Sequence, residues 1–262
     1  MFNFTKLSLF IRRNYSSAKN LKKFYKNVSI ATQNVNEFQI LLDSKVLKTP
    51  NGNPFIINSE SLAHAVAHEW DSQNENIKRY SMHLTSLCNT SIDNPTGRNP
   101  EVVVKGLLEY LDSDTICFRC TEPNDLYEMQ CAFWNPVLEY IEQRYNVTPV
   151  ITDGIVLPKL PHESRKIFER YLLANNNFGL TGFQHCIETL KSVYLAIALT
   201  DNMLSVEQAV KLSRLEYEHQ VAKWGNVPWY HEVETVEMET RVAASAFLIY
   251  TSQNHHYVVS TK

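Results

Sequence analysis

Histidine–glutamate pairs are the residues of this chain with the clearest potential for metal or hydrolytic chemistry. Three such pairs occur in the sequence: His68-Glu69, His162-Glu163 and His231-Glu232. None of them continues as H-E-x-x-H, the spacing that places two histidines on one face of a helix around zinc. Two further histidines, His255-His256, stand near the end of the sequence, where loose order is expected. We therefore expect no metal site built by the protein.

A single Cys-x-x-Cys motif, Cys117-Phe118-Arg119-Cys120, is the second candidate for chemistry. A zinc site would need a second pair, and a redox dithiol would need a strand–helix context before the motif, and both are missing. The alternation of residues 116–120 favours a short extended segment with two half-buried cysteines, and the role of Cys117 and Cys120 stays open. The five cysteines are odd in number and unevenly spaced, which is typical of a reducing compartment.

Carboxylates form the third group, because six glutamates cluster towards the C-terminal end: Glu216, Glu218, Glu232, Glu234, Glu237 and Glu239. Hydrolysis or glycosidic chemistry needs carboxylates that converge on one substrate, and sequence spacing alone does not bring them together. For most of them we expect a solvated acidic face. A hydrolase or metalloenzyme that uses these glutamates and the histidine–glutamate pairs is the alternative, and it requires at least three such side chains in one pocket.

Glu216 stands apart from the other glutamates because of its apolar surroundings. A stripe of residues predicts one helix with a buried face: Val206, Val210, Tyr217, Val221 and Trp224. Glu216 lies at the edge of this stripe, so it is either paired with a basic residue inside the fold or kept for a cation of a partner. Spacing alone favours the internal pair. Trp224 in this stripe, and Trp70 in the stripe of Leu62 and Val66, are expected to be structural anchors.

Composition excludes several classes of protein. The 262 residues include 25 Lys+Arg and 28 Asp+Glu, a formal net charge of −3, and 44% of them are hydrophobic, which is typical of a globular chain. The seven glycines form no G-x-G-x-x-G, no P-loop and no G-x-S-x-G, so no dinucleotide, nucleotide or other cofactor is expected. The near-neutral charge argues against nucleic-acid binding. No run of 18 apolar residues predicts a transmembrane segment.

Two periodicities divide the chain. Between residues 24 and 58, short apolar runs separated by turn residues predict a small antiparallel sheet, which must pack on other elements. After Ser59 the period changes to that of a helix. Helices are expected at 61–75, around 103–111, at 126–145, from Thr181, from Ser205 and at about 232–250, with a loop at 148–161. The predicted fold class is α+β, with a β-rich domain at 24–58, a larger all-helical domain at 59–254 and a tail at 255–262.

The first 23 residues are expected to be a basic leader outside the fold. No acidic residue precedes Glu37, and arginine, lysine and serine accompany a short apolar run at residues 7–11. This composition is typical of a mitochondrial transit peptide, with a processing point after about Tyr15. An ordinary disordered basic tail is the alternative.

Several segments resemble one known family, the assembly chaperones that bind the α subunit of the mitochondrial F1-ATPase (ATP synthase assembly factor 2). The segments that carry the resemblance are Phe24-Tyr25-Lys26-Asn27-Val28, Leu47-Lys48-Thr49-Pro50, Glu69-Trp70-Asp71-Ser72-Gln73, residues 82–90, residues 110–119, Phe178-Gly179-Leu180-Thr181-Gly182 and residues 213–225, which run from Ser213-Arg214-Leu215-Glu216 through Gln220 to Lys223-Trp224-Gly225. They span residues 24–250. One departure is Trp134-Asn135-Pro136, where the family has Trp-Asp-Pro, and it puts one local hydrogen bond or ion pair in doubt.

The resemblance implies a chaperone without enzymatic activity or cofactor in the mitochondrial matrix, where attachment to the inner membrane surface is also compatible with it. Such a chaperone binds the unassembled α subunit transiently, suppresses its aggregation and hands it to the β subunit. Glu216 matches the family glutamate tied to this function, and Arg214 and Gln220 of the same motif are expected to contact the partner. A structural subunit of a stable complex is a further alternative.

Overall fold

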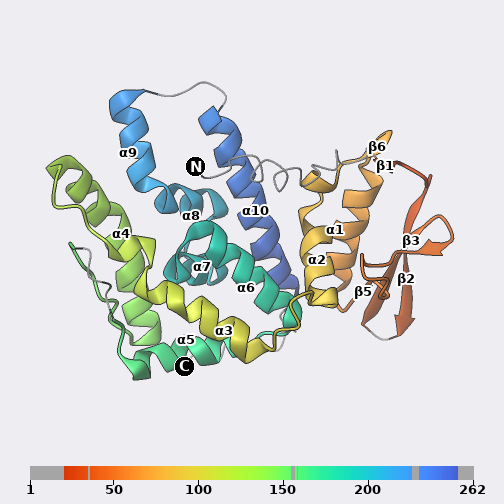
Figure 1. Ribbon diagram of the computed structural model, residues 1–262, viewed down its shortest axis with the longest axis horizontal. Helices are drawn as coiled ribbons and strands as arrows, with labels where there is room; N and C mark the ends of the chain where they lie inside the picture. Colours follow the sequence, from red (N-terminus) through yellow and green to blue (C-terminus); the bar gives the residue numbers. More distant parts are fainter. Residues whose placement is uncertain (1–20, 35, 155–156, 158, 226–229, 253–262) are drawn as a thin grey trace, which may run out of the picture.

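The structure is a computed structural model that describes residues 21–34, 36–154, 157, 159–225 and 230–252. The predicted leader lies outside these residues except for its last three positions, and the predicted tail lies wholly outside them. Figure 1 shows a small sheet at one end of the molecule and a body of helices at the other, which confirms the α+β class. No helix in these ranges is long and apolar enough to cross a membrane.

The sheet is antiparallel, as predicted. It contains β2 (Val28–Asn34), β3 (Glu37–Leu42), β4 (Lys45–Val46) and β5 (Ile56–Ile57), and β3 pairs with each of the other three. Asp43 makes the turn after β3 with a left-handed φ of 56°, a conformation that aspartate tolerates better than most residues. A separate pair joins β1 (Leu21–Lys22) to β6 (Asn76–Ile77).

The sheet packs on two helices, α1 (Glu60–Asp71) and α2 (His83–Asp93). Helix α1 begins where the period changes, because the Ser59 hydroxyl accepts a hydrogen bond from the Leu62 amide at 3.4 Å. Ile40 and Phe55 of the sheet region are buried against Leu62 of α1, and the same hydrophobic cluster includes Leu248 of the last helix. This packing supplies the buried surface that so small a sheet lacks.

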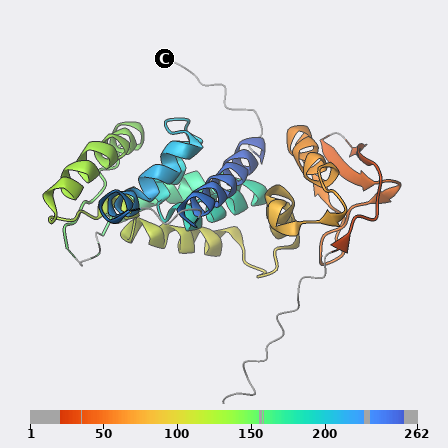
Figure 2. The same cartoon turned by 90° about the horizontal axis from the view of Figure 1, so that it is seen from above.

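The second hydrophobic cluster is built by eight helices: α3 (Pro100–Leu108), α4 (Asn124–Tyr145), α5 (His162–Leu173), α6 (Asn177–Leu190), α7 (Val193–Thr200), α8 (Val206–Ser213), α9 (Leu215–Trp224) and α10 (Tyr230–Ser252). Helix α7 is its centre, since every residue from Val193 to Leu199 is buried. Viewed from above, α4 lies at the end of the molecule opposite to the sheet (Figure 2). Helices α6 and α10 approach so closely that a Cβ atom on Gly182 would lie 2.7 Å from Ile249.

The start of α7 depends on a fully buried carboxylate. Asp114 accepts hydrogen bonds from the backbone amides of Val193 at 2.7 Å and Tyr194 at 3.2 Å, and from Ile116 at 3.3 Å. Burial raises the pKa of Asp114 to about 6, although the hydrogen bonds from Ser192 and the backbone amides oppose this shift.

Some helix boundaries differ from those predicted. The capping box at Ser205 and Gln208 starts α8 as expected. Thr181 does not start a helix, because Asn176, five residues earlier, caps α6 and accepts a hydrogen bond from the Gly179 amide at 3.0 Å. Lys191 adopts a left-handed φ of 56° and separates α6 from α7. Residues 206–224, predicted as one helix, form two helices that meet at Arg214. Helices α2 and α5 were not predicted.

Candidate partner-binding site

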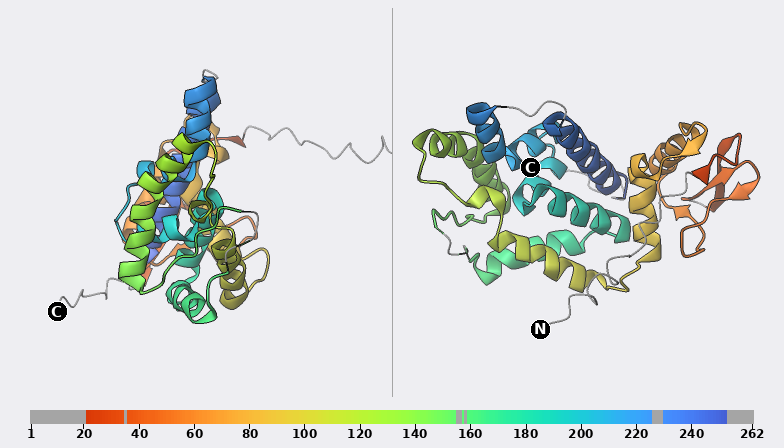
Figure 3. Two further views of the ribbon diagram at one scale, coloured as in Figure 1. Left: turned by 90° about the vertical axis from the view of Figure 1, so that its left-hand side faces the viewer. Right: turned by 45° about the horizontal axis from the view of Figure 1, so that its top comes forward.

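Helix α9 is the element that carries the predicted partner-binding residues. It lies beside α4 (Figure 3, right). His219 of α9 contacts Asp125 at the start of α4, with Nε2 and Oδ2 3.0 Å apart. The hydrogen bond from His219 lowers the pKa of Asp125. This contact helps to fix α9 against α4.

Glu216 is held by a neutral amide. The Nε2 of Gln130 donates a hydrogen bond of 2.7 Å to Oε1 of Glu216, and the Cys120 thiol lies 3.8 Å from the same oxygen. Gln130 is 0% exposed, and its Oε1 accepts a hydrogen bond of 2.9 Å from the Cys120 amide. Because both ends of the Gln130 amide are used, its nitrogen must point to Glu216.

No basic side chain of the described residues forms an ion pair with Glu216. The internal ion pair that spacing favoured is therefore not found there. Glu216 is half-buried, so its charge is partly desolvated but remains reachable. Burial, followed by the charge of Glu216, raises the pKa of the Cys120 thiol. A carboxylate in this state suits a cation supplied from outside the chain.

Arg214 does not have the partner-facing position that was expected. Its side chain is 10% exposed and its Nη2 lies 3.0 Å from Oε2 of Glu234 on α10. The guanidinium also stacks 4.4 Å from the ring centroid of Tyr217 and lies 3.8 Å from Glu218. Arg214 therefore ties the start of α9 to α10 within the chain.

Gln220 and Trp224 follow Glu216 at successive intervals of four residues, so the three share one face of α9. Gln220 is exposed, as a partner contact requires. Trp224 is 75% exposed, so the expectation that it anchors the core is wrong. Trp134 of α4 is the buried tryptophan of this region, and its Nε1 donates a hydrogen bond of 2.9 Å to the Leu212 carbonyl. We call Glu216, Gln220 and Trp224 the α9 strip.

An apolar groove next to this strip was missed in the sequence. It lies between α4 and α8 and has a volume of about 360 Å³. Phe133 and Pro136 of α4, Met203 and Leu204 before α8, and Leu215 beside Glu216 line it. Phe133 is 49% exposed, whereas Trp134, Val137 and Leu138 of the same helix are buried. An aromatic residue outside the buried stripe of a long helix was the signal that could have identified it.

The surface around the strip is acidic. Glu218, Glu232, Glu234 and Glu237 lie on α9 and the first turns of α10, where Val233 and Val236 are also exposed. Within the described ranges, no three histidine, cysteine or carboxylate side chains converge as a metal site would require. The convergence on which the hydrolase or metalloenzyme alternative depends is therefore not found there.

The Cys-x-x-Cys segment is structural. Burial raises the pKa values of both Cys117 and Cys120, so neither thiol is activated. Arg119 between them is buried, lies 5.0 Å from the ring centroid of Trp134, and donates a hydrogen bond of 3.0 Å to Oδ1 of Asn135. The asparagine at this departure from the family pattern thus keeps a hydrogen bond, although no ion pair is possible.

Trp70, the other expected anchor, lies far from α9. It is half-buried and packs against Tyr25, with ring centroids 5.8 Å apart. The Tyr25 hydroxyl donates a hydrogen bond of 2.7 Å to the Trp70 carbonyl. Trp70 therefore packs, as a partly buried residue, against the hydrophobic cluster that the sheet shares with α1 and α2.

Comparison with known proteins agrees with this architecture. Residues 22–142 match the family described as ATP12 chaperone protein. The mitochondrial protein atp12 of Schizosaccharomyces pombe is 28% identical over 246 residues, which cover 90% of this chain and 84% of the relative. Among crystal structures, a proposed chaperone from Agrobacterium tumefaciens has a TM-score of 0.83 at 26% identity and covers 88% of this chain and 86% of its own. Atp12 from Paracoccus denitrificans has a TM-score of 0.80 at 23% identity, covers 89% and 99% respectively, and shares the fold. The chain is therefore similar to the ATP12 chaperone proteins in the sequence of residues 22–142 and in fold over most of its length.

Proposed function

We propose that this protein is a mitochondrial matrix chaperone that binds the unassembled α subunit of the F1-ATPase during assembly of ATP synthase. The observation that carries the proposal is the state of Glu216, a half-buried carboxylate held by a neutral amide rather than by a cation. A partly desolvated charge that forms no ion pair with the described residues is suited to pairing with a Lys or Arg of a partner.

The surroundings of Glu216 fit a protein client. Trp224 at the end of the α9 strip is exposed, and tryptophan is among the residues that contribute most to binding at interfaces. The groove beside Leu215 offers apolar surface within the same region. A ring subunit exposes apolar interface surface before its neighbour arrives, and such surface promotes aggregation. A binder with a central charge and flanking apolar contacts can cover it.

Release is proposed to occur by competition. The sequence contains no P-loop, so nothing in it couples release to nucleotide hydrolysis. When the β subunit occupies the same interface of the α subunit, the chaperone is displaced. The acidic surface around the α9 strip accelerates the first encounter with a basic client surface.

Light scattering of isolated α subunit, with and without the purified protein and without nucleotide, tests the proposal. The protein should suppress aggregation, and Glu216→Lys should abolish suppression even well below the melting temperature of the variant, which loses the acceptor of the buried Gln130 amide. Glu139→Lys is the matched control, because Glu139 is an exposed glutamate of α4 outside the α9 strip. If Glu216→Lys protects the α subunit as well as the parent protein does, the proposed site is wrong.

A further inference from the structure

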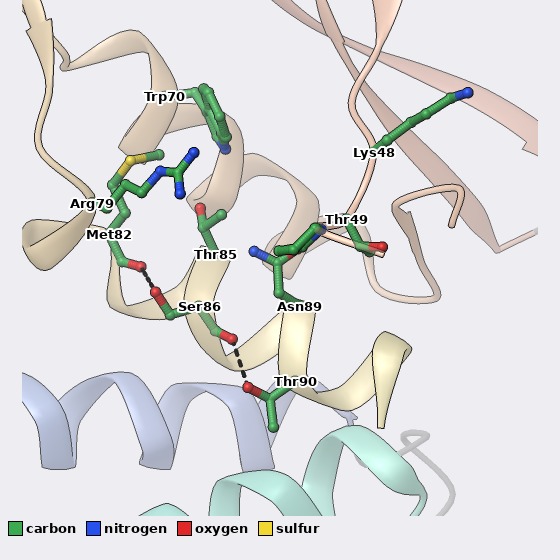
Figure 4. A pocket seen from close by; sticks show the side chains of 10 residues that line it. Lys48, Thr49, Trp70, Arg79, Met82, Thr85, Ser86, Asn89 and Thr90 are labelled. Atoms are coloured by element: carbon green, nitrogen blue, oxygen red, sulfur yellow. Dashed lines mark hydrogen bonds between the residues drawn. The ribbon is translucent and has the colours of Figure 1, made fainter. Parts of the chain in front are cut away.

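A second recess lies beside α1 and α2 (Figure 4), two helices that Figure 1 shows at the sheet end of the molecule, far from α9. It has a volume of about 520 Å³ and lies between α1, α2 and the loop after β4. Its lining includes Lys48, Pro50, Trp70, Arg79, Met82 and Asn89. Three of the segments that carry the family resemblance, at residues 47–50, 69–73 and 82–90, come together here. We call this recess the Trp70 groove.

Both walls of the Trp70 groove are fixed by carboxylates. Asp93 at the end of α2 accepts hydrogen bonds from Thr49 Oγ1 at 2.5 Å and Asn53 Nδ2 at 2.8 Å, which hold the loop. Glu69 accepts hydrogen bonds of 2.8 Å from the backbone amides of Leu84 and Thr85 at the start of α2. The groove is therefore organised before any ligand binds, which lowers the entropic cost of binding.

Two buried polar atoms in this groove lack partners. Trp70 Nε1 and Asn89 Oδ1 form no hydrogen bond with the described part of the chain. Figure 4 shows the indole nitrogen of Trp70 directed towards the face of α2 that carries Thr85 and Asn89. An unsatisfied buried group is unfavourable, and such groups in native proteins require an explanation. Neither atom reaches solvent in the unliganded fold, so rotation of the two side chains is needed to bring this donor and this acceptor to the carbonyl and N–H of a bound peptide backbone.

The charges at the rim indicate which peptide fits. Lys48 and Arg79 are exposed, and neither forms an ion pair within the described residues. These two cations favour an acidic occupant. Residues 1–20 of this chain contain four basic residues and no acidic one, so they do not suit the groove. The charge complementarity favours another protein.

We propose that the Trp70 groove binds an extended acidic segment of the client polypeptide. The segment's backbone pairs with Trp70 Nε1 and Asn89 Oδ1, and its carboxylates pair with Lys48 and Arg79. The inference rests on the proposed function, since it assumes a client, and adds a second point of contact at the opposite end of the molecule from Glu216. Two linked contacts hold a client more tightly than either does alone.

Overlapping peptides of about 15 residues that cover the F1-ATPase α subunit are the probe. They are titrated into the ¹⁵N-labelled full chain, and the Trp70 indole N–H signal is assigned with the Trp70→Phe variant. Acidic peptides should move this signal. Lys48→Glu combined with Arg79→Glu should weaken their binding about tenfold or more. Lys45→Glu combined with Lys105→Glu changes the charge equally at exposed lysines outside the groove and should leave binding unchanged.

A second pair of variants separates binding from folding. Trp70→Phe and Asn89→Leu remove the two unsatisfied atoms, which form no bonds in the unliganded fold, so the melting temperature should not fall. Both should weaken capture of the peptides that move the Trp70 signal. If they bind these peptides as the parent does, water satisfies the two atoms and the inference is overturned.

The proposed function and this inference fail in distinguishable ways. If the protein suppresses aggregation of the α subunit through Glu216 but no peptide moves the Trp70 signal, only the groove assignment is overturned. If the protein does not suppress aggregation at all, the proposed function fails, and the inference fails with it.

Discussion

Gln130 of α4 and Glu216 of α9, which lie 86 positions apart in the sequence, form a hydrogen bond of 2.7 Å. The bond joins α4 to α9 without compensating the charge of the carboxylate. A lysine or arginine at position 130 would neutralise Glu216 and would leave the Cys120 amide without its acceptor. The neutral amide keeps both the geometry and the charge, which is why we regard Gln130 as a positioning residue.

Replacement of Gln130 tests this relationship. Gln130→Leu leaves Glu216 and the Cys120 amide without their partner, so we expect a loss of stability of about 1–3 kcal/mol and weaker protection of the α subunit. Protection is compared well below the melting temperature of each variant. Gln184→Leu is the matched control, because Gln184 donates a hydrogen bond of 2.9 Å to Glu188 on an exposed helix face. Full protection by folded Gln130→Leu would show that Glu216 needs no positioning.

Arg214 provides a test of how α9 and α10 are joined. Arg214→Met removes the contacts with Glu234 and Tyr217, and we expect faster hydrogen exchange in the first turns of α10 than in the parent. Glu234 is nearly half exposed, so the change in global stability should be small, about 1 kcal/mol or less. Lys166→Met, which breaks the exposed pair with Glu163, serves as the control. Unchanged exchange at residues 232–239 would contradict the link.

Local signals in the sequence predicted several elements because short-range chemistry determines them. Ser59 and Ser205 each accept a backbone hydrogen bond three residues ahead, and both start helices as expected. The strands between residues 28 and 57 follow from alternation and turn residues. What periodicity could not show is which elements pack together, and α1 and α2 share a cluster with the sheet.

The prediction for α9 failed because a break was read as continuous helix. Arg214 interrupts the stripe at 206–224, held by contacts with Glu234, 20 residues further on. After such a break, the face assigned to Trp224 no longer follows from Val206 and Val210. The edge position predicted for Glu216 rested on the same continuous stripe, whereas Leu215 is the buried residue of α9, and the partner Gln130 could not be identified from spacing.

The leader makes a prediction of its own, which concerns localisation. Because residues 1–36 contain arginine, lysine and serine but no acidic residue, we expect import into mitochondria and removal of the first residues. N-terminal sequencing of the protein purified from mitochondria should begin near Ser16. An intact Met1 on the mitochondrial protein would refute processing.

Replacement of Trp224 tests whether this side chain stabilises the core or contacts the partner at the surface. Since its side chain is 75% exposed, Trp224→Ala should leave the melting temperature almost unchanged. Protection of the α subunit should weaken by roughly 2 kcal/mol of binding free energy, as expected for an aromatic residue at an interface. Phe24→Ala, which truncates an exposed aromatic residue at the sheet end, should not reduce protection. A fall in melting temperature for Trp224→Ala would show that the ring is buried.

Asp114 predicts how stability depends on pH. An aspartate in an unfolded chain titrates near 3.9, and burial raises the pKa of Asp114 to about 6 in the fold. Between these values the folded protein binds more protons than the unfolded chain, so stability from this group is full below about pH 4 and is lost as the pH rises through about 6.

Comparison of the parent with Asp114→Asn isolates this contribution, because the other titrating groups are common to both proteins. Asparagine keeps one acceptor for the amides of Val193 and Ile116 but cannot serve both, so the substitution should destabilise the protein. The loss should be largest near pH 4 and smaller by up to about 3 kcal/mol at pH 7, where the parent carries a buried charge. Denaturant unfolding of both proteins between pH 4 and 7 measures the difference. A difference that does not change with pH would show that the carboxylate at the start of α7 titrates as it does in the unfolded chain.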